Sequence, residues 1–181
     1  METRELDGVT AYLGLGSNLG RREDNLAAAM RGLHRAESSP EADIQVLRAS
    51  SIYETAPWGL ETQPDFLNSA LEISTRLTPI GLLTWAKAVE KKMGRRPAAR
   101  NAPRVIDVDI LLYDGVIVDQ PDLQIPHPRL HLRAFALIPL AELDGSLVHP
   151  ALKTTIQDLA VRVGGRPGVR LWRPPLELAG K

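Results

Sequence analysis

Two helical patterns are interleaved with four strand-like segments in residues 10–113. Thr78 followed by Pro79 is typical of a helix start, and Gly94 after Lys91 and Lys92 is typical of a helix end. In chain order we expect a strand at 10–15, a helix at 23–33, strands at 44–53 and 66–77, a helix at 79–93 and a strand at 104–113. This order describes a split βαβ arrangement. It predicts an α+β fold, with a mainly antiparallel sheet and helices packed on it.

Shorter elements are expected around this framework. Residues 54–65 contain Pro57, Gly59 and Pro64 and are expected to form a loop. The sequence also indicates a turn at 114–115 leading into a hairpin of 116–118 and 123–125, a short helix at 132–138 ending before Pro139, a helix at 155–163 and a strand at 169–172. We expect a single domain over residues 1–181, with a core at about 10–165 and a loose tail at 173–181.

The overall charge and composition argue against several classes of protein. The chain has 22 basic and 22 acidic residues, so no net field favours nucleic acid or an anionic membrane. It has no cysteine, which removes disulfides, zinc-thiolate sites and thiol nucleophiles. The N-terminus has no signal-like pattern, and no apolar run is long enough to span a bilayer. We expect a cytoplasmic monomer that binds neither nucleic acid nor membrane.

The glycine-rich stretch LGLGSNLG at 13–20 follows the first expected strand and suggests a phosphate cradle. Its glycines do not have the spacing of a dinucleotide-binding turn, and no Gly-Lys-Ser/Thr follows for a P-loop. We expect Gly14 and Gly16 instead to allow a close backbone approach at the end of the strand. Ser17 and Asn18 should turn the chain into the first helix.

Asp107 and Asp109 lie in the expected strand at 104–113. Residues two apart in a strand point to the same side, so the two carboxylates share one face, opposite Ile106, Val108 and Ile110. Two adjacent carboxylates repel each other unless a cation lies between them. Mg²⁺ is commonly held by one or two carboxylates together with substrate phosphates. A solvent-facing edge strand is the alternative for this stretch alone.

A basic loop precedes the two acids. Its arginines, with no acid among them, are Arg95, Arg96, Arg100 and Arg104. Guanidinium groups match phosphate oxygens in a forked geometry. A solvated loop is the alternative for the arginines alone, but a triphosphate with its metal ion requires opposite charges at adjacent positions.

A histidine between two prolines forms a third cluster. His127 is followed by Arg133 and Phe135 near an expected helix start. The histidine is equally compatible with a nucleotide contact and with an ordinary hydrogen-bonded loop.

A fourth cluster combines aromatic and small polar side chains. Trp58 and Phe66 can sandwich a flat heterocycle while Thr55 and Asn68 contact its polar edge. Such stacking is worth roughly 0.5–1.5 kcal/mol beyond burial. Aromatic residues that anchor the core are the alternative.

Six motifs in one collinear order resemble the 6-hydroxymethyl-7,8-dihydropterin pyrophosphokinases of folate biosynthesis. They are GSN after the first strand, YETxPxG, QPDFLN, Glu90 through Gly94-Arg95, PRxIDxDIL and IPHPRxxxRxF, and they cover about residues 10–145. The resemblance implies transfer of a pyrophosphoryl group from ATP to the pterin hydroxymethyl group, with release of AMP. It also implies a ferredoxin-like sandwich, which agrees with the order of the expected elements.

The resemblance further implies roles for individual residues. Asp107 and Asp109 correspond to ligands of two Mg²⁺ ions, and Arg95 and Arg104 to arginines that hold the phosphates during catalysis. Implied nucleotide contacts are Glu90, Arg95, Arg104, Ile110, His127 and Arg133. Implied pterin contacts are Thr55, Ala56, Trp58, Phe66, Asn68 and Phe135.

Three positions depart from the family pattern. Asn101 stands where many members have tryptophan, and Pro97 stands where a second loop arginine is common. Trp58 stands where a smaller apolar residue is frequent. These departures leave the metal pair and Arg104 intact. A non-catalytic ferredoxin-like binding module and an ATP-dependent transferase with another acceptor remain as alternatives.

Overall fold

A six-stranded antiparallel sheet forms the centre of the computed structural model, which describes residues 8–34, 44–57, 62–96, 102–164 and 168–177. Strand β1 (Val9–Ser17) lies between β4 (Phe66–Thr75) and β5 (Asp107–Tyr113). The other edge of β4 pairs with β2 (Ile44–Ala49) and then with β3 (Ile52–Thr55), and β3 pairs with β8 (Val169–Arg173). The expected α+β class with a mainly antiparallel sheet is confirmed.

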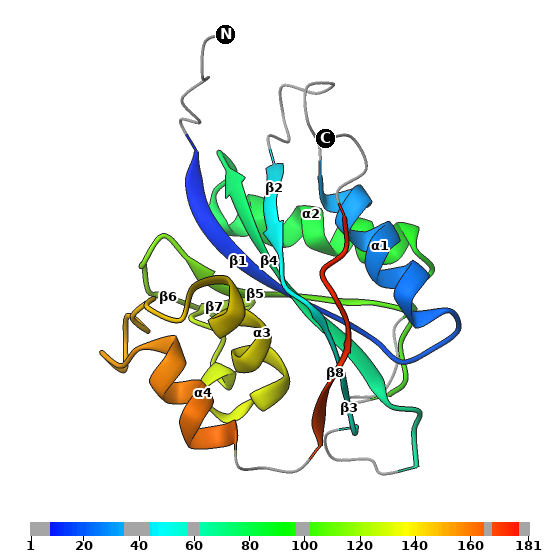
Figure 1. Cartoon of the computed structure of the whole chain (residues 1–181). Helices are drawn as coiled ribbons and strands as arrows, with labels where there is room; N and C mark the ends of the chain where they lie inside the picture. Colours follow the sequence, from blue (N-terminus) through cyan, green and yellow to red (C-terminus); the bar gives the residue numbers. More distant parts are fainter. Residues whose placement is uncertain (1–7, 35–43, 58–61, 97–101, 165–167, 178–181) are drawn as a thin grey trace, which may run out of the picture.

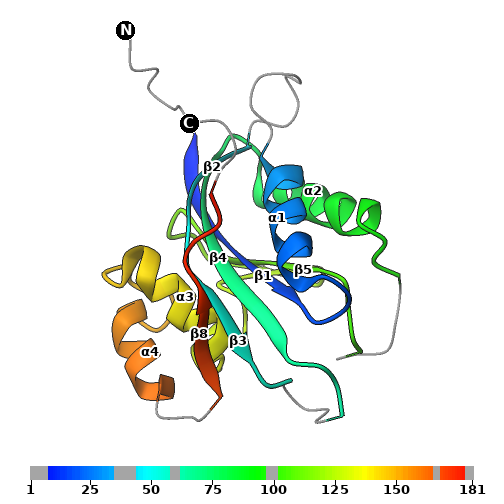
Figure 2. The same ribbon diagram turned by 45° about the vertical axis from the view of Figure 1, so that its right-hand side comes forward.

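Helices cover both faces of this sheet. Helices α1 (Arg22–Leu33) and α2 (Pro79–Lys92) lie on one face, and α3 (Ala134–Asp144) and α4 (Ile156–Gly164) lie on the other (Figures 1 and 2). A short hairpin of β6 (Val118–Gln120) and β7 (Leu123–Ile125) and a 3-10 turn at Leu130–Leu132 lead from β5 to α3. The expected hairpin at 116–118 therefore begins two residues later than predicted.

The period of two along β1 and β4 divides the core into two apolar clusters. Leu13 and Leu71 pack on the α1 and α2 side, whereas Tyr12 and Ala70 pack with Leu137 on the α3 side. Burial of one leucine side chain contributes about 1.5–3 kcal/mol. The two clusters together hold the sheet between its helix layers.

The expected strand at 44–53 is wrong in one respect, because it is broken between β2 and β3. At the break, the Ser50 N–H donates to the Ala70 carbonyl at 2.9 Å, and the Ser50 hydroxyl accepts from the Ala70 N–H at 2.9 Å. A serine side chain thus replaces one backbone group of the ladder. The break allows β3 to run separately along the first residues of β4.

The strand expected at 104–113 begins at Asp107, so Arg104 lies outside the ladder. The Arg104 N–H donates to Asn18 Oδ1 at 2.8 Å, and the Asn18 N–H donates to the Arg104 carbonyl at 3.2 Å. The Asn18 amide also donates to the Pro64 carbonyl at 3.2 Å. The turn after β1 therefore fixes the backbone on which Arg104 is carried.

The expected end of a helix before Pro139 is also wrong, because α3 continues to Asp144 with Pro139 inside it. Proline within a helix loses one backbone hydrogen bond and costs about 3 kcal/mol. Leu137, Leu140 and Leu143 are buried on either side of Pro139. Their packing offsets the local cost.

The C-terminal elements are close to expectation. Helix α4 starts with a Thr155 hydroxyl that accepts from the Asp158 N–H at 3.1 Å, and β8 covers the expected strand. Leu176 packs partly buried against the α1 and α2 cluster, a contact that the expectation of a loose tail from residue 173 did not include.

Candidate active site

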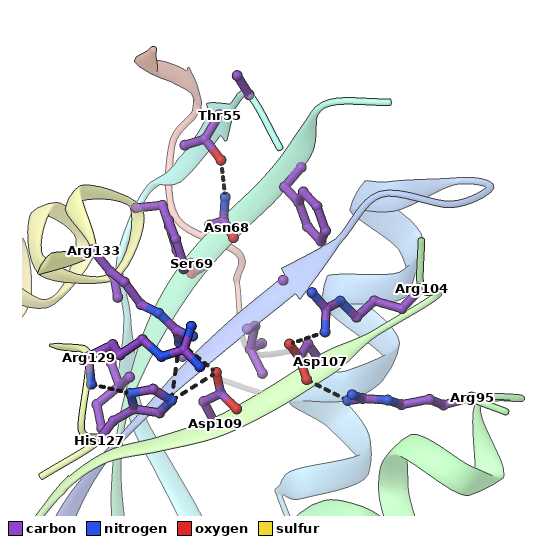
Figure 3. Close-up of a pocket in the computed structure, with 18 of the residues that line it drawn as sticks. Thr55, Asn68, Ser69, Arg95, Arg104, Asp107, Asp109, His127, Arg129 and Arg133 are labelled. Carbon is purple, nitrogen blue, oxygen red and sulfur yellow. Dashed lines mark hydrogen bonds and ion pairs between the residues drawn. The ribbon is translucent and has the colours of Figure 1, made fainter. Parts of the chain in front are cut away.

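A cavity of about 380 Å³ opens beside the N-terminal part of α3. Figure 3 shows Asp107 and Asp109 at its centre, with Arg95 and Arg104 approaching from one side and His127 and Arg133 from the other. The expected site residues that line it are Arg95, Arg104, Asp107, Asp109, His127, Arg133, Thr55, Ala56, Phe66, Asn68 and Phe135. Segments far apart in the sequence therefore meet in one place.

The two acids project together because β5 alternates. Val108 and Ile110 face the α1 and α2 cluster, so Asp107 and Asp109 face the cavity. Burial alone would raise the pKa of Asp107, but Arg104 and Arg95 outweigh it and hold that pKa below its ordinary value. Burial and the charge of Asp107 raise the pKa of Asp109. The second carboxylate is therefore less well compensated than the first, and its charged form would be favoured by an added cation.

Arg95 joins the C-terminal end of α2 to β5. Its Nη1 donates to Glu90 Oε1 at 2.5 Å and to Asp107 Oδ1 at 2.5 Å. Burial would lower the pKa of Arg95, but Asp107 and Glu90 raise it above its ordinary value. The guanidinium is held charged at the cavity wall.

Glu90 and Ile110 are not among the residues that line the cavity. Glu90 is 3% exposed, and its carboxylate accepts from the Val108 N–H at 2.7 Å and from Lys87 Nζ at 3.0 Å. Ile110 lies in the core on the side of β5 that packs against α1 and α2. In this structure Glu90 anchors Arg95 and the strand, and the nucleotide contacts implied for Glu90 and Ile110 stay predictions.

His127 reaches the acids through an irregularity in β5. The pairing of β1 with β5 shifts register so that Leu111 is an extra residue, and its carbonyl accepts from the His127 N–H at 3.1 Å. His127 Nε2 then lies 3.9 Å from Asp109 Oδ2, and Arg133 Nη1 lies 3.4 Å from the same oxygen. Burial lowers the pKa of His127 below its ordinary value, and the nearby charge of Asp109 offsets this only in part.

The opposite end of the cavity carries the aromatic and amide groups. The Asn68 amide donates to the Thr55 hydroxyl at 2.8 Å, which orients both groups. The Arg104 guanidinium lies 5.5 Å from the centre of the Phe66 ring, and Arg133 lies 5.5 Å from that of Phe135. Each ring therefore lies next to one of the arginines that flank Asp107 and Asp109.

The glycines of LGLGSNLG form part of the wall between the two ends. A Cβ at Gly16 would lie 3.1 Å from Asn68 Oδ1, and one at Gly14 would lie 3.3 Å from Leu111 Cδ2. Both glycines line the cavity. The predicted close approach at this strand is confirmed.

Some expected residues lie outside the described part of the chain. Trp58, Pro97, Arg100 and Asn101 belong to this group. The stacking role of Trp58 and the effect of Pro97 and Asn101 stay predictions.

Sequence reasoning missed four polar lining residues: Gln63, Ser69, Lys87 and Arg129. Lys87 precedes Glu90 by three residues on α2, a spacing that places both on one helix face and could have indicated it. Arg129 lies inside the IPHPR motif, which was noted without a role for this arginine. Ser69 adjoins Asn68 in a strand, and simple alternation directs it to the other face, so no sequence signal indicated it.

Comparison with known proteins identifies the family. The model of the 7,8-dihydro-6-hydroxymethylpterin-pyrophosphokinase (HPPK) family matches residues 12–145. The chain belongs to the HPPK family. This match runs from within β1 through α3 and contains every expected site residue.

Named HPPK relatives agree with this assignment. The 2-amino-4-hydroxy-6-hydroxymethyldihydropteridine pyrophosphokinase of Bacillus subtilis is 41% identical over 153 residues, which is 84% of this chain and 89% of the relative. The protein of the same name from Methylorubrum extorquens is 44% identical over 138 residues, covering 76% of this chain and 84% of the relative. The folic acid synthesis protein fol1 of Schizosaccharomyces pombe is 38% identical over 162 residues, which is 90% of this chain but only 21% of that protein.

Solved structures of HPPK-DHPS proteins share the fold. One, described as a complex with substrates, superposes with a TM-score of 0.66 at 15% identity, covering 86% of this chain and 43% of the solved chain. A Plasmodium falciparum HPPK-DHPS structure gives 0.66 at 16% identity, covering 88% and 46%. This chain thus spans less than half of those proteins. The predicted ferredoxin-like arrangement is confirmed.

The described residues contain no group of three or more His, Cys, Asp or Glu side chains arranged to hold a metal ion. Within the same ranges, none of the helices has the length and apolar character needed to cross a bilayer.

Proposed function

We propose that this HPPK family member transfers the pyrophosphoryl group of ATP to 6-hydroxymethyl-7,8-dihydropterin, releasing AMP, as a step of folate biosynthesis. One observation carries the proposal: an acid pair flanked by arginines shares a cavity with two phenylalanines and a paired Asn-Thr. The acid pair and arginines, which form the cationic half of the cavity, suit ATP. The two phenylalanines and the Asn-Thr pair, which form the opposite half, suit a flat pterin with a polar edge. The family match supports the same assignment.

The triphosphate is assigned to the cationic half of the cavity. Arg95, Arg104 and Arg133 are held by carboxylates in the structure, and a phosphate chain offers the same acceptor geometry to their forked donors. Lys87 and Arg129 add two further positive charges to the lining. Negative charge that develops on the β-phosphate during transfer is stabilised by groups already in place.

The acid pair fits Mg²⁺. In the part of the chain that the structure describes, no third acidic or histidine side chain joins the two carboxylates in a metal-binding group. Such a pair suits an ion that takes its remaining ligands from water and substrate phosphates. The raised pKa of Asp109 reflects burial and repulsion from Asp107, which a bound divalent cation relieves. Mg²⁺ held by Asp107 and Asp109 would supply charge neutralisation of the phosphates and a lower pKa for the pterin hydroxyl.

The pterin is assigned to the opposite half. Phe66 and Phe135 provide flat apolar surfaces for stacking, and the Asn68 and Thr55 pair provides polar groups for the ring edge. The hydroxymethyl group then points toward Asp107 and Asp109. Its oxygen attacks the β-phosphorus, and the residues contribute chiefly by fixing the two substrates in line.

Product analysis tests the proposal. Purified protein is incubated with ATP, Mg²⁺ and 6-hydroxymethyl-7,8-dihydropterin, and nucleotides are separated by ion-exchange chromatography. The proposal predicts AMP that forms only when the pterin is present. Formation of ADP, or AMP with another alcohol but not with the pterin, would indicate a different transferase. No turnover together with ligand binding would indicate a binding module.

The proposal describes a cytoplasmic monomer with no nucleic-acid partner. Sedimentation velocity at micromolar concentration tests whether the protein is a monomer, since a dimer would sediment as a species of twice the chain mass. Cell fractionation tests the compartment.

A further inference from the structure

A buried carboxylate lies directly behind the pterin half of the cavity. Glu54 is the residue before Thr55 on β3, and its side chain is 5% exposed. Arg22 Nη1 of α1 donates to Glu54 Oε1 at 2.9 Å, and Arg170 Nε of β8 donates to Oε2 at 2.7 Å. A buried charge requires such partners, so the carboxylate binds three elements together.

Arg22 also ties Glu54 to the start of β4. The same Nη1 donates to the Asp65 carbonyl at 2.7 Å, and Asp65 immediately precedes Phe66. Thr55 and Phe66 are register partners in the β3 and β4 ladder. Arg22 and Glu54 therefore fix the two strand ends that present Thr55, Phe66 and Asn68 to the cavity, although neither charged residue lines it.

Strand β8 supports this pair from the outside. Arg170 is the register partner of Glu54, and β8 lies alongside β3 in both views (Figures 1 and 2). The Trp172 ring lies 5.4 Å from the Arg22 guanidinium, and its Nε1 donates to Glu23 Oε1 at 2.6 Å. Arg170 and Trp172 lie beyond the family match at 12–145. A segment outside the matched region thus contacts Glu54 and Arg22 inside it.

We propose that Arg22 and Arg170 are positioning residues for the pterin, acting through Glu54 on Thr55, Phe66 and Asn68. This inference rests on the proposed function, because it concerns the second substrate of that reaction. The triphosphate half is held by a separate set of contacts, between Arg95, Glu90 and Asp107. Loss of the Glu54 contacts therefore weakens binding of the pterin and leaves binding of ATP unchanged.

Four variants of the full chain test this inference. Arg22→Gln removes the link to both Glu54 and Asp65, and Arg170→Gln removes only the outer partner, whose side chain is 70% exposed. Arg173→Gln is the matched control, because it removes an arginine from the same strand that pairs with Glu23 and not with Glu54. Arg170→Lys should retain most of the pterin affinity that Arg170→Gln loses.

The readouts are KM for each substrate, kcat, and two binding constants. Dihydropterin binding is measured by fluorescence with Mg²⁺ and a non-hydrolysable ATP analogue, and analogue binding is measured by calorimetry. We expect Arg22→Gln to raise KM and Kd for the pterin about tenfold, the size of one lost aromatic stack, and Arg170→Gln about threefold. The analogue Kd should stay within about twofold of wild type for every variant, and Arg173→Gln should match wild type throughout.

Two results would overturn the inference while leaving the proposed function intact. One is wild-type pterin affinity in both Arg22→Gln and Arg170→Gln; if Arg22→Gln fails to fold, Arg170→Gln alone decides. The other is equal loss of pterin and analogue affinity, which would mean a purely structural role. Absence of pterin-dependent AMP from the wild-type chain would instead overturn the proposed function.

Discussion

Replacement of Glu90 by glutamine should destabilise the protein and disable Arg95. The Glu90 carboxylate is 3% exposed and accepts from the Val108 N–H at 2.7 Å, from Arg95 at 2.5 Å and from Lys87 at 3.0 Å. The glutamine carbonyl oxygen can still accept one hydrogen bond, but the NH₂ group is a donor and cannot accept from Arg95 or Lys87. The variant therefore leaves Arg95 and Lys87 without their shared counter-charge.

The expected size follows from the exposure of the partners. Removing one member of a buried ion pair costs about 3–5 kcal/mol. The Arg95 and Lys87 side chains are 26% and 48% exposed, so solvent screens part of this, and we expect about 2–3 kcal/mol. With a urea dependence of about 2 kcal/mol per M, the midpoint of unfolding falls by about 1–1.5 M.

Urea denaturation followed by circular dichroism measures this change, with Glu72→Gln as the matched control. Glu72 pairs with Arg48 at 2.5 Å, and the Arg48 side chain is 53% exposed. Neither residue lines the cavity, and pairs open to solvent in this way contribute about 0.2–1 kcal/mol. The midpoint of this control should fall by about 0.5 M or less. If Glu90→Gln unfolds at the same urea concentration as the control but raises KM for ATP, Glu90 is a nucleotide contact and the anchoring argument is refuted.

Three other perturbations have defined outcomes. Asp109→Asn should lower the rate of AMP formation ~100-fold or more without lowering the melting temperature, because burial and Asp107 already disfavour its charge; near-normal turnover would refute its role. Removal of Mg²⁺ with EDTA should abolish AMP release, and readdition of Mg²⁺ should restore it. Electron paramagnetic resonance in the presence of an ATP analogue should show Mn²⁺ bound by wild type and bound much more weakly by Asp107→Asn. Full Mn²⁺ binding by this variant would contradict the metal assignment. Glu54 should contribute to stability in a pH-dependent way. Burial opposes its charge, but Arg170 and Arg22 hold its pKa below the ordinary value of 4.5. The contribution of Glu54 to stability is therefore complete above pH 4.5 and is lost as the pH falls through the lower pKa of the folded state. Urea midpoints measured between about pH 6 and pH 3 should therefore fall more steeply in wild type than in Glu54→Gln, and parallel curves would show that the pair contributes nothing.

Local signals in the sequence were sufficient for much of the fold. Thr78 and Pro79 start α2, and the Thr78 hydroxyl accepts from the Gly81 N–H at 3.2 Å as a cap should. The alternation around Asp107 and Asp109 correctly placed both carboxylates on one face, because strand geometry alone determines it. These features depend on neighbours within a few residues.

Features that depend on distant partners were not predictable. The break at Ser50 is stabilised by Ala70, and passage of α3 through Pro139 depends on burial of Leu137 and Leu140. The support of Glu54 by Arg170 joins residues 116 positions apart. No local pattern encodes such contacts, so only the folded chain reveals that β8 is joined to Glu54, the residue before Thr55 on β3.

The fate of the β-phosphate tests the central claim most directly. ATP carrying a radioactive label at the β-phosphate is incubated with the protein, Mg²⁺ and 6-hydroxymethyl-7,8-dihydropterin, and the pterin product is separated from nucleotides. The account predicts that the label moves to the pterin together with the γ-phosphate, leaving unlabelled AMP in equal amount. Label that remains in ADP, with only the γ-phosphate transferred, would contradict it.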